Sequence, residues 1–439
     1  MTDKNFFMLN KIKNILLKSF LFFFPFQTIY IIQEQFLNGS KWQYGTVGFY
    51  FTEMLLWLLI IFFIIDYFVL LKNKKVKIQS GFSKEKLFSV SILLFLLYLL
   101  YNTFFVAQDL QVAWQMTRWF ELSFLLFIIL TSGFLKSKEI LWSVVLGSIL
   151  PSLLGIWQFL SQSSFANKFL GLALHAPEVS GVSVITSDQI GRWLRAYGTF
   201  NHPNIFGGYL VLVIIFTFLL MRKIESKKQN IFLICVLFVE TMVLFFTFSR
   251  TAWLAWLIFI VFVSLNYFVI NKKVVWPMIF SFVFFAILFS MFFSLVQNRL
   301  EIKSTYEIKS ISQRVTGYRE VLEIWDKHKY LGVGIGNYTL ASYNLESNKN
   351  GNIYQPVHNI FLLFVVENGI IGFALFCFIL VTFFIYYFSI VDRKKIFFSV
   401  VLAFIYLILG FFDHYLLSSY IGLMILVLYL AVINRLSTE

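Results

Sequence analysis

Of the five histidines in the chain, His358 has the surroundings that best suit proton transfer. It stands in the sequence Gln-Pro-Val-His-Asn, directly before a long apolar run. A neutral imidazole at the mouth of an apolar helix can accept a proton from a hydroxyl group, so His358 is a candidate general base and its neighbour Asn359 a candidate substrate ligand. The alternative role for His358 is a hydrogen bond at the helix start. The other histidines rank below it: His175, His202, His328 and His414.

Arg250 is a single charge inside a long apolar stretch. No other charged residue occurs between Glu240 and Lys272. A charged group at membrane depth is costly, so it usually has a function there. The planar guanidinium matches the oxygen atoms of a phosphate better than a lysine does. We therefore expect Arg250 to bind an anionic ligand; the alternative is a side chain that reaches the lipid headgroups.

Two further arginines stand in polar segments. Arg195 precedes Tyr-Gly-Thr-Phe-Asn-His-Pro-Asn, where Asn201 or Asn204 can cap the next helix. A helix N-terminus beside an arginine attracts anions, so these residues are candidate ligands, with plain capping as the alternative. Arg314 lies near the start of an amphipathic stretch, residues 313–329, where it can face the membrane surface.

A glycine-rich segment follows, Leu-Gly-Val-Gly-Ile-Gly-Asn-Tyr, ending at Tyr338. No nucleotide-binding strand and helix surround it, so a dinucleotide site is excluded. The glycines predict a close backbone approach or a tight re-entrant turn. Within this turn, Gly334, Gly336 and Tyr338 are candidate substrate contacts.

The same segments lack the usual signatures of metal sites and cofactors. The long polar segments contain no paired carboxylates and no His/Cys cluster with metal-ligand spacing, and the chain has no phosphate-binding Walker sequence. The sequence therefore predicts no metal and no cofactor.

The composition places these residues in a membrane protein. Hydrophobic residues make up 59% of the 439 residues and charged residues 13%, and 57 residues are phenylalanine. Soluble domains are about 45–50% apolar and about 25% charged. No soluble protein of this size has enough interior to bury so much apolar surface.

Twelve apolar runs are long enough to cross about 30 Å of hydrocarbon. They predict an all-α polytopic membrane protein with a large, partly helical exoplasmic loop between the ninth and tenth spans. In the fourth span, Arg118 and Glu121 lie one helical turn apart and are expected to pair. The predicted spans are residues 14–34, 45–71, 87–106, 112–135, 140–161, 204–221, 231–249, 250–270, 274–297, 358–389, 394–411 and 413–433.

Lysines and arginines cluster in alternate loops, which by the positive-inside rule predicts that both termini are cytoplasmic. This bias explains the net charge of +14, so no nucleic-acid partner is implied. The expected organisation is five N-terminal membrane helices, an exoplasmic loop, helices six to nine, a large exoplasmic loop and helices ten to twelve. These parts are residues 1–161, 162–203, 204–297, 298–357 and 358–439.

Four motifs, which follow one another along the chain, make it resemble the O-antigen ligase and O-antigen polymerase superfamily of bacterial membrane glycosyltransferases. The resemblance covers about residues 190–375, and the first five spans match in topology only. One departure is Tyr330, where the family often has a proline before the glycine-rich turn. The motifs are the segments 195–204, 249–253, 314–338 and 358–372.

The resemblance implies a metal-independent, inverting enzyme of cell-envelope biosynthesis in the bacterial cytoplasmic (inner) membrane, with its active site exoplasmic. The donor would be a glycan on undecaprenyl diphosphate, and the acceptor a hydroxyl of lipid A–core or of the growing glycan. Arg195, Arg250 and Arg314 look like the family's diphosphate-binding arginines, and His358 like its essential histidine.

Alternatives remain at this point. Ligase (lipopolysaccharide biosynthesis) and polysaccharide polymerase are both open, and so is a protein O-oligosaccharyltransferase. A transporter or flippase of lipid-linked sugars also fits twelve spans, although it predicts two repeated halves with interrupted helices, which the sequence does not show.

Overall fold

The computed structural model describes residues 3–72, 83–187, 191–266, 271–301 and 305–438. Within these residues, nine helices are long and apolar enough to cross a membrane, and two shorter apolar helices, α8 and α16, accompany them. The predicted all-α polytopic fold is confirmed. The nine are α2 Phe51–Lys72, α3 Lys84–Phe105, α4 Leu110–Thr131, α5 Ser137–Ser161, α6 Pro203–Lys223, α7 Lys227–Phe246, α9 Lys272–Met291, α13 Ile360–Ile390 and α14 Arg393–Phe412. The shorter helices are α8 Arg250–Leu265 and α16 Tyr420–Thr438, and a further helix, α1, spans Asp3–Phe23.

The second half of the first predicted span is not helical. Helix α1 ends at Phe23, and β1 (Ile29–Leu37) pairs antiparallel with β2 (Ser40–Tyr50). The predicted second span, 45–71, accordingly begins as a helix only at Phe51. The Asn-Gly pair at Asn38 joins the strands with positive φ at both positions, a strong hairpin signal that hydropathy alone overlooks.

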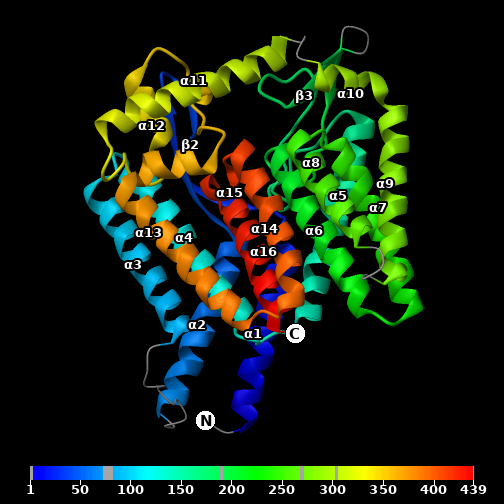
Figure 1. Ribbon diagram of the computed structural model, residues 1–439. Coiled ribbons are helices and arrows are strands. Elements are labelled where there is room, and N and C mark those ends of the chain that lie inside the picture. Colours follow the sequence, from blue (N-terminus) through cyan, green and yellow to red (C-terminus); the bar gives the residue numbers. More distant parts are fainter. Residues whose placement is uncertain (1–2, 73–82, 188–190, 267–270, 302–304, 439) are drawn as a thin grey trace.

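The two termini lie at one end of the molecule, and the two long segments between membrane helices, within residues 162–203 and 298–357, lie at the other. Figure 1 shows both termini at the lower end of the bundle, and β2, β3, α10, α11 and α12 at the upper end. The prediction of a large, partly helical segment between the ninth and tenth spans is confirmed. The upper elements are β3 Val184–Ser187, β4 Gly191–Leu194, α10 Phe293–Leu300, α11 Thr305–Lys327, α12 Tyr338–Leu345, the 3-10 turn Gly351–Ile353 and α15 Tyr415–Ser418.

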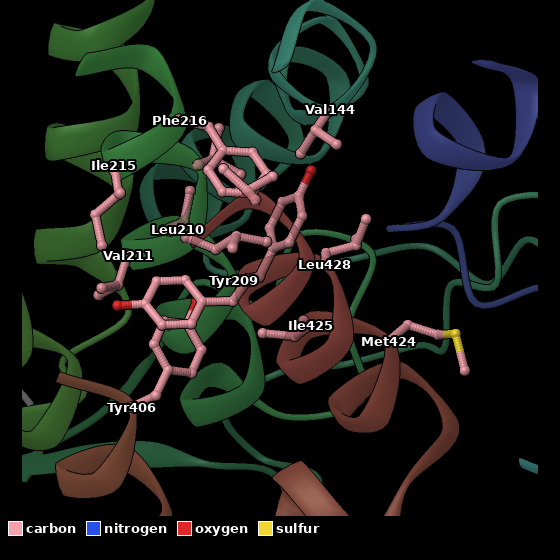
Figure 2. Close-up of a cluster of buried hydrophobic side chains, with 14 of the residues drawn as sticks. Val144, Tyr209, Leu210, Val211, Ile215, Phe216, Tyr406, Met424, Ile425 and Leu428 are labelled. Atoms are coloured by element: carbon pink, nitrogen blue, oxygen red, sulfur yellow. The ribbon is translucent and has the colours of Figure 1, made fainter. Parts of the chain in front are cut away.

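Helix α6 forms the centre of the bundle. Nearly nine tenths of its apolar window is buried, and Figure 2 shows Tyr209 of α6 among side chains that include Val144 of α5 and Leu428 of α16. Two glycines at its N-terminal end allow close packing, because a Cβ on Gly207 would lie 2.8 Å from Ala252 Cβ of α8. The neighbouring Gly208 meets α15 in the same way. The start of α6 is thereby fixed between α8 and α15.

The hairpin β1–β2 is attached to the large upper segment. In its second strand, the indole of Trp42 is buried and donates a hydrogen bond to Thr339 Oγ1 of α12 at 3.0 Å. The N–H of Gly351 donates to Ser40 Oγ at 2.6 Å. These bonds place β2 beside the residues that form the site.

Helix α13 is interrupted near its start, and the glycine-rich segment fills the interruption. Gly369 has φ 63° and ψ −175°, which frees carbonyl groups of the preceding turn. The carbonyls of Val366 and Glu367 accept hydrogen bonds from the N–H groups of Val333 at 3.1 Å and Gly334 at 3.0 Å. The segment thus satisfies backbone groups that would otherwise be unpaired.

The glycines are required by this packing. Gly332, Gly334 and Gly336 have φ of 75°, 99° and 75°. A Cβ on Gly332 would lie 2.3 Å from the carbonyl oxygen of Glu367, and one on Gly334 would lie 2.3 Å from Ala107 Cα in the link between α3 and α4. The predicted close backbone approach is confirmed.

Candidate active site

Two histidines and an aspartate from distant parts of the chain converge at the upper end of the bundle. Asp413 and His414 form the link between α14 and α15, and His358 precedes α13. One ligand atom from each residue lies within 4.8 Å of the other two. The rings of His358 and His414 are 5.3 Å apart between centroids and nearly perpendicular. Sequence analysis ranked His414 low and overlooked Asp413.

Asp413 is held in place by the start of α6. Its Oδ2 accepts a hydrogen bond from Asn204 Nδ2 at 2.9 Å, and its Oδ1 accepts one from the backbone N–H of His414 at 2.8 Å. Asn204 Oδ1 in turn accepts from Arg195 Nη2 at 2.8 Å. His202 caps α6, with Nδ1 accepting the N–H of Asn204. Asn204 thereby connects a buried cation to a buried carboxylate.

Arg195 is almost completely buried, with 2% of its surface exposed. Its Nε donates to the carbonyl of Thr247 at 2.7 Å, and its Nη1 donates to Ser183 Oγ at 2.7 Å. The guanidinium therefore ties the first polar segment to the end of α7 and to α6. The bond to Thr247 brings the motif at 195–204 next to the motif at 249–253, which begins two residues after Thr247.

Arg250 lies at the first residue of α8 and is half-buried. Its Nη1 donates to the backbone carbonyl of Arg299 in α10 at 3.3 Å, and Arg299 Nε donates to the carbonyl of Phe248 at 3.2 Å. Phe248 has a positive φ of 46°, which turns its carbonyl at the junction of α7 and α8. The structure thus places a second arginine, missed from the sequence, beside Arg250.

Arg314, in α11, has a buried guanidinium nitrogen without a partner. Within the residues that the structure describes, its Nε is buried and makes no hydrogen bond. Burial lowers the pKa of His358, Asp413 opposes this, and the positive charge of Arg314 lowers that pKa further. Buried N–H groups are nearly always satisfied. Arg314 therefore presents an unsatisfied donor and a positive charge close to His358.

His202, which lies beside the cluster, and His414, which belongs to it, are neutral at physiological pH. Burial lowers the pKa of His202 to about 3 and that of His414 to about 4. Burial opposes ionisation of Asp413, but the neighbouring imidazoles and the amide of Asn204 hold its pKa below the ordinary value. The cluster thus combines an ionised carboxylate with neutral imidazoles.

Tyr44 of β2 also reaches the cluster. Its ring lies 5.9 Å from that of His414, in an edge-to-face arrangement. Burial raises the pKa of Tyr44, and the charge of Asp413 raises it further, so the hydroxyl stays protonated. Sequence analysis missed this residue because it expected its neighbourhood to enter a membrane span.

Two further predicted ligands, Asn201 and Asn359, stand in the links that precede α6 and α13. Asn201 is exposed in the link before α6. Asn359 caps α13, accepting from the N–H groups of Phe361 and Leu362, and donates to the carbonyl of Phe411 at the end of α14 at 3.2 Å. This amide fixes the spacing between α13 and α14, and hence between His358 and Asp413.

Gly334, Gly336 and Tyr338 lie in the packed interior. Tyr338 is 1% exposed, and its hydroxyl donates to the carbonyl of Gly317 of α11 at 3.3 Å. Gly336 packs on Met116 of α4. These residues hold α11 and α13 together, and with them Arg314 and His358.

Part of the chain matches a known protein family. Residues 231–377 match the family described as O-antigen ligase. The match includes Arg250, Arg314 and His358; Arg195 and Asp413 lie outside it. No curated protein sequence matches the chain.

Proposed function

We propose that this chain, whose residues 231–377 match the O-antigen ligase family, transfers a glycan from undecaprenyl diphosphate to an acceptor hydroxyl at the outer face of the bacterial cytoplasmic membrane. The observation that carries the proposal is Arg314: a buried cationic donor without a partner lies close to His358, a neutral base. A diphosphate supplies the acceptor atoms that Arg314 lacks. The acceptor is a hydroxyl of lipid A–core or of the growing glycan.

In this reaction His358 takes the proton of the acceptor hydroxyl while the oxygen attacks the anomeric carbon. The new carbon–oxygen bond forms opposite the bond to the diphosphate, which breaks, so the anomeric configuration inverts. Negative charge then grows on the diphosphate, and Arg314 and Arg250 stabilise it without a metal. Fixed donors of this kind typically contribute roughly 10²–10³-fold each to the rate.

Asp413 supports the proton transfer. A carboxylate beside a histidine stabilises the imidazolium that forms when the base is protonated. Asn204 orients the carboxylate, and Arg195 orients Asn204 at 2.8 Å. We therefore assign Arg195 a positioning role through Asp413 in place of direct contact with diphosphate, because its guanidinium is enclosed by protein groups.

The proposal is tested by transfer in vitro with the purified full chain in lipid nanodiscs. Undecaprenyl-diphosphate-linked glycan is incubated with either acceptor, and products are analysed by mass spectrometry and by NMR of the anomeric centre. His358→Ala and Arg314→Ala should abolish or strongly reduce transfer. His328→Ala is the matched control, since His328 is an exposed histidine at the end of α11.

Four outcomes would contradict the proposal. Unchanged transfer by His358→Ala would remove the proposed base. Retained anomeric configuration would exclude a single in-line displacement. Movement of the donor across the bilayer of a vesicle without bond formation would favour a transporter, and transfer to protein alone would favour an O-oligosaccharyltransferase.

A further inference from the structure

The cluster of His358, Asp413 and His414 has the composition of a metal-binding site. We infer that these three residues bind a transition-metal cation, with Zn²⁺ as the reference case, and that the bound cation switches glycan transfer off. The binding part stands on geometry alone, and the inhibition rests on the proposed function of His358.

The spacing of the ligand atoms suits a small cation. One atom from each of the three residues lies within 4.8 Å of the other two. Zn–N and Zn–O bonds of about 2.0–2.1 Å place tetrahedral ligands about 3.3 Å apart. The proposal requires the ligand atoms to move closer by about 1.5 Å at most. Two histidines and a carboxylate leave a fourth position for water, as in open zinc sites.

The surrounding hydrogen bonds orient the ligand atoms. His414 Nδ1 lies 2.6 Å from Ser418 Oγ, so its other nitrogen, Nε2, is left toward Asp413 Oδ1 at 4.0 Å. Asp413 Oδ2 is held by Asn204. Metal-binding histidines characteristically have the second ring nitrogen engaged in this way, and metal-binding carboxylates are hydrogen-bonded in turn.

The chemistry of the ligands selects the kind of cation. Imidazole nitrogens suit Zn²⁺, Cu²⁺ and Ni²⁺, whereas Mg²⁺ and Ca²⁺ require mostly oxygen ligands, and the cluster offers a single carboxylate. The positive charge of Arg314 near His358 repels a bound cation, so we expect the affinity of the cluster for the metal to be moderate.

Metal binding and proton transfer compete for the same lone pair. An imidazole nitrogen that coordinates a cation cannot accept a proton from an acceptor hydroxyl. A cation at this cluster also neutralises Asp413, which removes its support for an imidazolium. Transfer therefore requires the metal-free site.

Binding is measured first, because it does not depend on the reaction. The full chain in detergent is stripped of metal, and Zn²⁺ is titrated by calorimetry, with Co²⁺ absorption as a report of coordination geometry. His414→Ala and Asp413→Asn should each weaken binding by more than the roughly 10–100-fold typical of outer contacts, and Ser418→Ala by that outer-contact amount. His328→Ala should bind as the wild type does.

No saturable binding by the wild type, or equal binding by His414→Ala and the wild type, would overturn the site. Size-exclusion profiles and thermal unfolding identify variants that fail to fold; His414→Gln then replaces His414→Ala.

Inhibition is measured in the transfer assay with and without Zn²⁺. Wild-type transfer should fall on metal addition and recover with chelator, while Ser418→Ala, which removes the contact to His414 Nδ1, should need a higher Zn²⁺ concentration for the same inhibition. Metal binding in a protein that transfers nothing under any condition would reject the proposed function and keep the site. Transfer that is unaffected or increased by bound metal would reject the inhibition and keep the function.

Discussion

Asp413→Asn is the most informative single substitution, because it removes one charge and preserves the shape of the side chain. A ring nitrogen of His358 lies within 4.8 Å of a carboxylate oxygen of Asp413. At that distance and an effective dielectric constant of about 20, a unit charge stabilises an imidazolium by about 3.5 kcal/mol, or roughly 300-fold in rate. We expect a fall in transfer rate of about this size.

The pH dependence identifies the cause of the fall. In the wild type the charge of Asp413 raises the pKa of His358 against the effect of burial. Without that charge, the pKa of His358 falls further. The base then stays deprotonated to a lower pH, so the acid limb of the pH–rate profile should move to lower pH while the maximal rate decreases.

The assay is single-turnover transfer over a pH series, for Asp413→Asn, His358→Ala and the double variant. If Asp413 acts through His358, the double variant should be no slower than His358→Ala alone. Additive losses, or a slower variant whose acid limb stays in place, would refute the reasoning. Thermal unfolding of each variant separates loss of folding from loss of proton transfer.

Three further predictions follow from the same contacts. Arg314→Ala should lower transfer by roughly 10²–10³-fold, with partial recovery in Arg314→Lys; equal rates for wild type and Arg314→Ala would reject a diphosphate contact. Gly332→Ala should lower the unfolding temperature, because its Cβ would meet the carbonyl of Glu367 at 2.3 Å; unchanged unfolding would contradict the packing. Arg118 of α4 forms a buried ion pair with Glu53 of α2, so Arg118→Ala should destabilise the fold by about 3–5 kcal/mol because it leaves the Glu53 carboxylate without its cation; the double variant Arg118→Leu, Glu53→Leu should recover much of this in thermal unfolding.

Local features of the sequence predicted the membrane fold well. Helix-length apolar runs have few alternative structures in a bilayer, so the positions of most spans followed from hydropathy. The Asn-Gly hairpin was missed because Ile29–Leu37 is apolar enough to resemble the end of a helix. Pairing with β2 satisfies the backbone N–H and C=O groups of this segment, as a helix would.

Pairings between distant residues were beyond local reasoning. Arg118 was expected to pair with Glu121 on its own helix, but it pairs with Glu53 of α2 at 2.5 Å, so that prediction was wrong. Spacing along one helix indicates which of its side chains can form a pair. The side chains of the neighbouring helix decide which pair actually forms. The partner of Arg195 in α6 was within reach of the sequence, since Asn204 was itself a candidate.

By itself the sequence determined an all-α polytopic membrane protein, its likeness to a family of glycosyltransferases, and the residue types able to bind phosphate or move a proton. Only the tertiary structure decided that Asp413 and His414 lie beside His358, that Tyr44 reaches them, and that Arg195 supports Asn204. The physical reason is that these residues come from separate helices and a hairpin. The distances between them depend on how α6, α13 and α14 pack. Glycines and helix caps fix this packing, and no single segment of the sequence encodes it.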